Sequence, residues 1–271
     1  MAAAGVLLAT LVALELVLRA TVTPFRIPPP PAPGTLDPYA ANPFIVVARP
    51  WLQTFVPGSR YRAARASYDV EYAINAHGFR GPEIGHKHGR RLLVVGDSIA
   101  EGHGVPFESA LPSLLGRALD GDGWEVVSAA MQGASPVYYA ANVGRHLALQ
   151  PDAVILLLYE NDLWDDRARE AAYADLPLLD DEASLRLLVV AQRAWRNLFP
   201  TPLERRILAN RELTAAPPVD ARFPWVLSES EVDRQFRASA PYLDAFAGEL
   251  AARDVPLVVA FVAIGALVPA G

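Results

Sequence analysis

The sequence predicts a three-layer α/β/α domain, in which a parallel β-sheet lies between two layers of helices, preceded by an apolar helix at the N-terminus. Two observations support this fold class. From residue 91 onward, short apolar runs alternate with segments of helical periodicity, as in βαβ units. At the other end, the residues before Arg19 contain a single charge, Glu15. Hydrophobic residues make up 52% of the chain, which is enough to bury a sizeable core.

Composition and charge exclude several classes of protein. The formal net charge is −6 and the sequence pI is about 5.4, whereas a general nucleic-acid binder carries a basic surface. The chain has no cysteine, so neither disulfides nor thiolate metal sites can form. His86 and His88 could bind a stray metal ion, but no neighbouring ligand supports a metal site there. We therefore expect no nucleic-acid partner and no metal.

Residues 1–22 are predicted to be a transmembrane anchor. As a helix, the residues before Arg19 would span about 27 Å, close to the roughly 30 Å hydrocarbon core of a bilayer. Glu15 and Arg19 have the i, i+4 spacing of a helical pair and could meet at the membrane surface. A cleaved signal peptide is one alternative, although the sequence lacks a basic first segment and a small-residue cleavage site. A buried core helix is the other.

The segment between the anchor and residue 91 divides into two parts. Residues 23–50 are rich in proline, which favours an extended linker. Residues 51–90 are predicted to form an N-terminal extension with short strands. Within it, residues 67–75 alternate as a strand does, and the turn that follows contains Gly78, which is free to take a positive φ.

Residues 91–271 carry the α/β pattern and are predicted to form the main domain. Buried parallel strands are expected at 91–95, 124–130, 152–159 and 256–264, with helices at 108–119, 135–149 and 229–254. The stretch of about residues 165–223 is irregular and charged, with a helical middle. We interpret it as an insertion that is either a lid or a membrane-facing cover.

Three residues suited to acyl chemistry follow the first three predicted strands. Ser98 follows the first strand, Gly133 the second and Asn161 the third. In a parallel sheet, ligands bind outside the carboxyl ends of the strands. A serine hydroxyl there can attack an acyl carbon, while a backbone N–H and an amide can stabilise the resulting oxyanion. The pattern therefore indicates serine-based ester chemistry, which requires no cofactor.

The same residues resemble the conserved blocks of the SGNH, or GDSL, hydrolase family. Gly96-Asp97-Ser98 matches its first block, Gly133 the glycine of its second and Asn161 the asparagine of its third. The stretch "INAHGFRGPE" and the N-terminal "ELVLR" are similar to the bacterial, membrane-anchored branch of the family. The resemblance covers about residues 70–265.

This resemblance implies a flavodoxin-like order of strands and a role for each matching residue. Ser98 would be the nucleophile and its own N–H an oxyanion donor, with Gly133 N–H and the Asn161 amide completing the oxyanion hole. Asp97 would shape the turn. The plainer alternatives are that Ser98 is a helix N-cap, Gly133 a turn glycine and Asn161 part of an ordinary strand-to-helix turn.

The resemblance also implies a single-pass protein with its globular domain outside the cytoplasm. Arg19 and Arg26 follow the apolar segment, so the positive-inside rule read alone would keep that domain in the cytoplasm. The two predictions of membrane orientation therefore disagree, and the prediction from the positive-inside rule depends on two arginines alone.

One part of the family pattern is missing. The family's base is a histidine in an Asp-x-x-His block near the C-terminus, whereas no histidine follows His146 and no Asp-x-x-His occurs. We therefore expect a sheet that lacks its last strand, in a chain that is truncated, frame-shifted or a fragment of a longer enzyme. His103, in the loop after Ser98, is expected to contact substrate and is only a last-resort candidate for the base.

These features lead to two functional hypotheses. The first is a membrane-anchored ester hydrolase or O-acyltransferase that acts on an acylated carbohydrate, lipid or small molecule and is impaired as written because it lacks the histidine. The second is a catalytically inactive SGNH-like protein that binds a ligand in the same crevice, or a truncated remnant.

Overall fold

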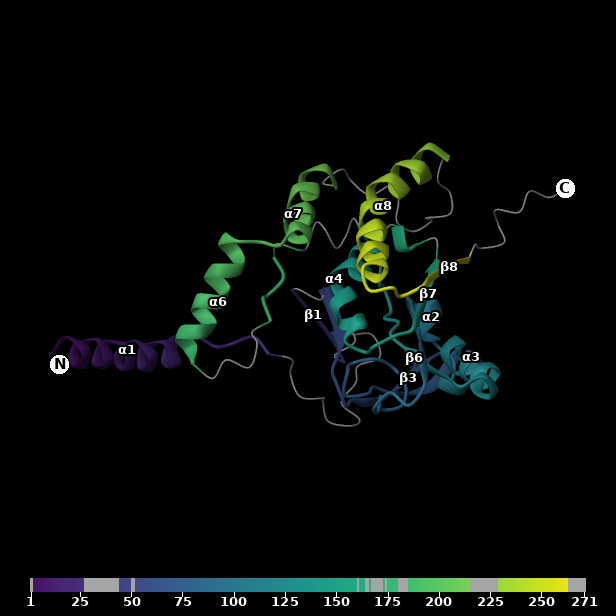
Figure 1. The fold of residues 1–271 in the computed structure, drawn as a ribbon, viewed down its shortest axis with the longest axis horizontal. Coiled ribbons are helices and arrows are strands. Elements are labelled where there is room, and N and C mark those ends of the chain that lie inside the picture. The colour runs from purple at the N-terminus through teal and green to yellow at the C-terminus, as the bar shows by residue number, and fades with distance from the viewer. Residues whose placement is uncertain are drawn as a thin grey trace.

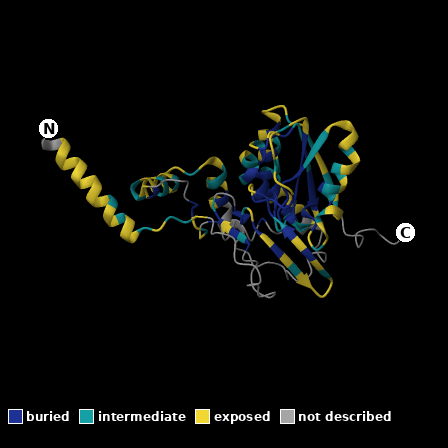
Figure 2. Ribbon diagram, turned by 90° about the horizontal axis from the view of Figure 1, so that it is seen from below, coloured by how far each residue is buried: buried dark blue, intermediate teal, exposed yellow. Residues whose placement is uncertain are grey.

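The computed structural model describes residues 2–26, 44–49, 52–159, 161–163, 166, 173, 175–179, 185–214 and 229–262. Most of the predicted proline-rich linker lies outside these residues. Helix α1 (Ala2–Thr21) extends away from the rest of the chain (Figure 1), and its side chains are largely exposed (Figure 2). Its segment Ala4–Thr21 has a mean hydropathy of 1.8, apolar enough for a membrane span or a signal sequence.

Two antiparallel hairpins precede the main domain. The first pairs β1 (Ile45–Ala48) with β2 (Leu52–Phe55), and the second pairs β3 (Arg60–Arg65) with β4 (Tyr68–Ala73). β1 lies within residues 23–50, which the sequence predicts to be linker, so we count it with the N-terminal extension. The second hairpin contains the strand predicted from the alternation at 67–75. In the turn that follows, Gly78 has a φ of +76°, and a Cβ there would lie 2.7 Å from Thr54 Oγ1. Glycine is therefore required on both conformational and steric grounds.

The main domain contains a four-stranded, fully parallel sheet, as predicted. Its strands lie in the order β6-β5-β7-β8, which is the 2-1-3-4 order of flavodoxin-like folds. They are β5 (Arg90–Gly96), β6 (Trp124–Ser128), β7 (Ala153–Tyr159) and β8 (Leu257–Val262). Among the described residues β8 forms one edge of the sheet.

Two apolar clusters show that helices cover both faces of the sheet. Leu93 and Val95 of β5 belong to the larger cluster, together with residues of α4 (Pro136–Leu147) and α8 (Glu229–Ala251). Val94 lies between them in sequence and belongs to a second cluster, with residues of α2 (Ser98–Glu101) and α3 (Leu111–Leu119). Because side chains alternate along a strand, the two clusters lie on opposite faces, which gives the three predicted layers.

The extension packs into the larger of these cores. Tyr61 stacks on Phe44 and on Tyr72, with ring centroids 4.3 and 4.8 Å apart. These three rings and Phe79 share one buried cluster with Leu93 and its neighbours. The hairpins therefore contribute to the same core as the sheet.

The remaining described elements are short turns and two helices of the predicted insertion. The 3-10 turns η1 (Phe107–Ser109) and η2 (Asp120–Asp122) flank α3. The helices of the insertion are α6 (Arg186–Leu198) and α7 (Pro202–Thr214). In Figure 1 they lie between α1 and the main domain.

His146 is a fully buried histidine of α4, consistent with a structural role. Its ring lies against those of Phe79, Tyr138 and Phe246, with centroids 6.0–6.5 Å away. Neither ring nitrogen has a hydrogen-bond partner among the described residues. Burial, followed by the positive charge of Arg145, lowers the pKa of His146 to about 3, so the folded protein holds this ring neutral.

This lowered pKa predicts that His146 makes the fold sensitive to acid. Below about pH 6.5, His146 becomes protonated in the unfolded chain, whereas in the folded protein it stays neutral down to about pH 3. The free energy of unfolding should therefore fall with decreasing pH in this window, by up to about 1.4 kcal/mol per pH unit from this group. The variant His146→Phe should lose this part of the slope in urea denaturation at pH 4, 5, 6 and 7. Parallel slopes for the two proteins would contradict the prediction.

Candidate active site

Ser98 lies at the point where the central strand β5 turns into α2. Asp97, not Ser98, is the N-cap of α2, because its Oδ1 accepts a hydrogen bond from Ile99 N at 2.9 Å. Asp97 thus has the turn-shaping role that was expected, and the Ser98 hydroxyl is not used as the cap. Ser98 Oγ has one hydrogen-bond partner among the described residues, Asp97 Oδ2 at 3.3 Å. Burial raises the pKa of Asp97.

The predicted residues follow the carboxyl ends of neighbouring strands of the sheet. The chain passes from β5 to β6 on one side, then crosses to β7 on the other side of β5. Ser98 and Asn161 follow the two strands that flank this switch point, where open α/β sheets bind their ligands. Gly133 lies in the loop after β6, which returns to β5 through a hydrogen bond from Met131 N to Gly96 O at 3.0 Å.

Gly133 and Asn161 have local features that bear on their predicted roles. Gly133 has a φ of +64°, in the left-handed region that glycine adopts without strain. Asn161 is half-buried, and its Oδ1 is buried with no hydrogen-bond partner among the described residues. The three roles assigned to Ser98, Gly133 and Asn161 remain predictions.

Glu101 is a residue of this region that the sequence reasoning missed. It is fully buried on α2, and its Oε2 accepts a hydrogen bond from Gln132 N at 2.8 Å. The side-chain amide of Gln53 donates to the carbonyl of Gln132, so the residue before Gly133 is held from both sides. Burial raises the pKa of Glu101 to about 8, despite the opposing influence of the Gln132 hydrogen bond and the charge of Arg80.

Arg80, also missed, holds the loop that follows Ser98. Its side chain is fully buried, and its guanidinium donates to Gly102 O at 2.6 Å and to Val105 O at 2.7 Å. The same guanidinium lies 3.9 Å from the centroid of the Tyr72 ring. The sequence predicts only a turn here, because the residues around Arg80 do not indicate that its side chain reaches carbonyls more than twenty residues away.

His103 is held by the extension through both of its ring nitrogens. Nδ1 lies 3.1 Å from Tyr72 Oη, and Nε2 lies 3.1 Å from Tyr68 Oη. Burial and then the charge of Arg80 lower the pKa of His103, which favours the neutral ring. In this arrangement neither nitrogen is free to take a proton from Ser98, while the predicted contact with substrate stays a prediction.

Two buried carboxylates follow β7 and tie its end to α4. Asp162 Oδ2 accepts hydrogen bonds from Tyr139 Oη at 2.9 Å and from Tyr159 N at 3.2 Å. Asp166 Oδ1 accepts one from Val137 N at 2.7 Å, in the first turn of α4. Burial and the charge of Asp162 raise the pKa of Tyr139. These bonds fix the backbone on both sides of Asn161.

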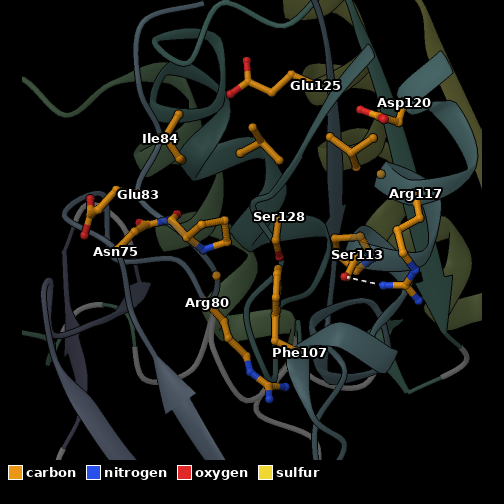
Figure 3. Close-up of a pocket in the computed structure, with 16 residues that line it drawn as sticks. Asn75, Arg80, Glu83, Ile84, Phe107, Ser113, Arg117, Asp120, Glu125 and Ser128 are labelled. Carbon is orange, nitrogen blue, oxygen red and sulfur yellow. Dashed lines mark hydrogen bonds between the residues drawn. The ribbon is translucent and has the colours of Figure 1, made fainter. Parts of the chain in front are cut away.

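A cavity of about 610 Å³ lies elsewhere, between the extension, η1, α3 and β6 (Figure 3). Arg80, Phe107, Arg117 and Ser128 are among its lining residues, and none of the predicted catalytic residues lines it. It is therefore separate from the candidate active site. Among the described residues, no group of three or more histidine, aspartate or glutamate side chains could hold a metal ion.

No protein-family model and no curated protein matches the chain. Among solved structures, TesA is 20% identical over 58% of this chain and 99% of its own, with a TM-score of 0.27. AlinE4, an SGNH-hydrolase family esterase, is 18% identical over 64% of this chain and 77% of its own, with a TM-score of 0.30. The esterase EstA from Pseudoalteromonas sp. is 13% identical over 63% and 77%, with a TM-score of 0.29.

AlinE4 thus belongs to the family that Gly96-Asp97-Ser98 resembles. All three TM-scores lie below 0.5.

The buried carboxyl of Glu101 predicts a second dependence of stability on pH, opposite in sign to that of His146. The pKa of Glu101 rises from its ordinary 4.5 to about 8 on folding, so the folded protein keeps a proton that the unfolded chain releases. The free energy of unfolding should therefore fall as pH rises through this window, by up to about 1.4 kcal/mol per pH unit.

The variant Glu101→Gln tests this directly, because its amide imitates the protonated carboxyl and can still accept from Gln132 N. Relative to wild type, its free energy of unfolding should increase steadily between pH 5 and pH 8 in urea titrations. Glu101→Ala is the control for the lost hydrogen bond, and it should be less stable than Glu101→Gln by about 1–3 kcal/mol at every pH. A constant difference between wild type and Glu101→Gln would contradict the raised pKa.

Proposed function

We propose that this chain is the scaffold of a serine ester hydrolase or O-acyltransferase of SGNH type, with Ser98 as nucleophile. The observation that carries the proposal is the placement of Ser98 and Asn161 after β5 and β7, the two strands that flank the switch point of the sheet. The sequence motif of the SGNH blocks agrees with this placement, and the buried contacts of Glu101 and Arg80 support a preformed site.

The proposed chemistry proceeds in two steps. Ser98 Oγ attacks the carbonyl carbon of an ester and gives its proton to a base, while the oxyanion is stabilised by Ser98 N–H, Gly133 N–H and the Asn161 amide. The C–O bond to the alcohol then breaks, and the departing alcohol takes the proton. Water or an acceptor hydroxyl attacks the acyl-enzyme in the second step, which gives an acid or a new ester and restores Ser98.

No described histidine is hydrogen-bonded to Ser98 Oγ, so no base for this reaction is assigned among the described residues. Ser98 Oγ donates to Asp97, both nitrogens of His103 are bonded to tyrosines, and His146 is enclosed by aromatic rings. The geometry therefore supports binding of an acyl group more strongly than its turnover. This observation favours, as a second candidate, a protein that binds acylated ligands in the same crevice with little catalysis.

The proposed setting is the surface of a membrane. Helix α1 would be the anchor, with the globular domain outside the cytoplasm, as the resemblance implies. The proposed substrates are acylated carbohydrates, lipids or small esters, and the net charge of −6 disfavours nucleic acid.

Chemical rescue tests the role of Ser98 together with the missing base. We expect the chain to hydrolyse p-nitrophenyl acetate at nearly the rate of the Ser98→Ala variant, because an unassisted serine hydroxyl is a poor nucleophile. Added imidazole should restore a Ser98-dependent rate. The increase in rate should be smaller than the about 10²–10⁴-fold that a positioned base contributes. The variant corrects for direct hydrolysis by imidazole.

One outcome would count against Ser98 as the nucleophile, and another would count only against the missing base. Equal rates for wild type and Ser98→Ala at every imidazole concentration would exclude Ser98 as the nucleophile. Strong Ser98-dependent turnover without imidazole would show that a base is present, and His103→Ala would then reveal whether His103 supplies it.

The anchor is tested by extraction of membranes with alkaline carbonate. The full chain should remain in the membrane pellet, and a variant that lacks residues 1–22 should be extracted, because it has lost the apolar helix. Sequencing of the N-terminus separates the alternatives. A processed N-terminus would indicate a signal peptide, and an intact, carbonate-extractable chain would indicate a core helix.

A further inference from the structure

Helix α6 has an apolar side that no described part of the protein covers. At 100° per residue, Leu188, Trp195 and Leu198 fall on one side of the helix, and they are 50%, 64% and 72% exposed. Phe199 extends this surface, with its ring centroid 4.3 Å from that of Trp195. Large apolar side chains exposed together on a helix indicate a membrane or protein interaction site.

The opposite side of α6 is basic and faces the rest of the chain. Arg193 donates to Thr23 O at 3.1 Å, just beyond the end of α1, and Arg196 donates to Leu179 O at 3.0 Å. Val189, on this same side, is fully buried. The apolar side is therefore turned away from the chain that leaves α1.

The first turn of α6 is bound to a carboxylate inside α1. Glu15 accepts hydrogen bonds from Arg186 N and Leu187 N, each at 3.0 Å, and from Arg19 Nε at 2.8 Å. The N–H groups of Arg186 and Leu187 belong to the first turn of α6, where a helix leaves its backbone donors without partners of its own. They also give Glu15, a costly residue in an apolar helix, partners for both carboxylate oxygens.

The position of Glu15 sets the depth at which α6 would start. At about 1.5 Å per residue, Glu15 lies about 9 Å before the end of α1 at Thr21. An amphipathic helix at a membrane surface places its apolar side about 5–10 Å into the boundary between headgroups and acyl chains. Figure 1 shows α6 rising steeply from the end of α1 instead of continuing along the axis of α1. A helix that lies in the membrane plane would turn away from a membrane-spanning α1 in this way.

We propose that α6 lies in the lipid interface as a second membrane contact, with Leu188, Trp195 and Leu198 among the acyl chains. The bilayer is the occupant of the apolar side, because α6 is bound to the one described helix apolar enough to cross a membrane. Of the two interpretations of the insertion, this favours the membrane-facing cover. The proposal rests on α1 as the anchor and is independent of the chemistry of Ser98.

The test uses the full chain in vesicles of phosphatidylcholine with a minor fraction of phosphatidylglycerol. Because the chain has no cysteine, single cysteines can be labelled with the fluorophore NBD. Leu198→Cys reports on the apolar side and Asn197→Cys, an exposed neighbour on the polar side, is its matched control. Leu11→Cys reports on the anchor itself, and Ser109→Cys on the water-exposed domain.

Two quenchers separate lipid from water and from protein. At Leu198→Cys we expect loss of quenching by iodide and strong quenching by nitroxide-labelled lipid, whereas Asn197→Cys and Ser109→Cys should remain open to iodide. Iodide quenching at Leu198→Cys equal to that at Ser109→Cys would overturn the proposal. Protection from both quenchers would also overturn it, because a second protein surface would then cover α6. Iodide quenching at Leu11→Cys is a separate result that would show failure of the anchor.

Discussion

The parallel pairing of β5 with β6 on one side and β7 on the other is the constraint on which the rest of the structure depends. This central strand is buried on both faces, so its apolar residues contribute to two cores at once. The chain reaches its second neighbour by crossing from one side of β5 to the other. In open α/β sheets, ligands bind in a crevice at such a switch point, outside the carboxyl ends of the two strands. Ser98 and Asn161 are the polar residues that follow these two strands.

Buried polar groups then fix the loops around the crevice. Asp97, Glu101 and Arg80 each bind backbone groups of segments that have no regular pairing of their own. Burial of such groups is costly unless they are hydrogen-bonded, so they specify one arrangement of the loops instead of adding much to stability. The raised pKa values of Asp97 and Glu101 are the electrostatic sign of this cost.

The fold could be predicted from the sequence because its signals are local. The apolar run 91–95 and the alternation at 67–75 each reflect a period that the residues themselves display. The positions of Ser98 and Asn161 followed from strand ends in the same way. The roles of Arg80, Glu101 and Glu15 could not be predicted, because each depends on a backbone partner distant in the chain. His103 illustrates the same limit, since two tyrosines of the extension, and not its closeness to Ser98, determine what its ring can do.

The segment between β7 and α8 connects the candidate active site to α1. It includes Asn161 and the predicted insertion of about residues 165–223, with α6 and α7, before α8 returns the chain to the sheet. Asp162 and Asp166 hold the start of this segment to α4, and Glu15 holds the first turn of α6 to α1. Carboxylates that bind backbone N–H or hydroxyl groups thus hold this segment at its start and at the first turn of α6. Under the proposed anchoring of α1, an apolar substrate in the lipid would meet the same segment of chain that leaves the candidate active site, and for this reason we propose the membrane surface as the source of the acyl group.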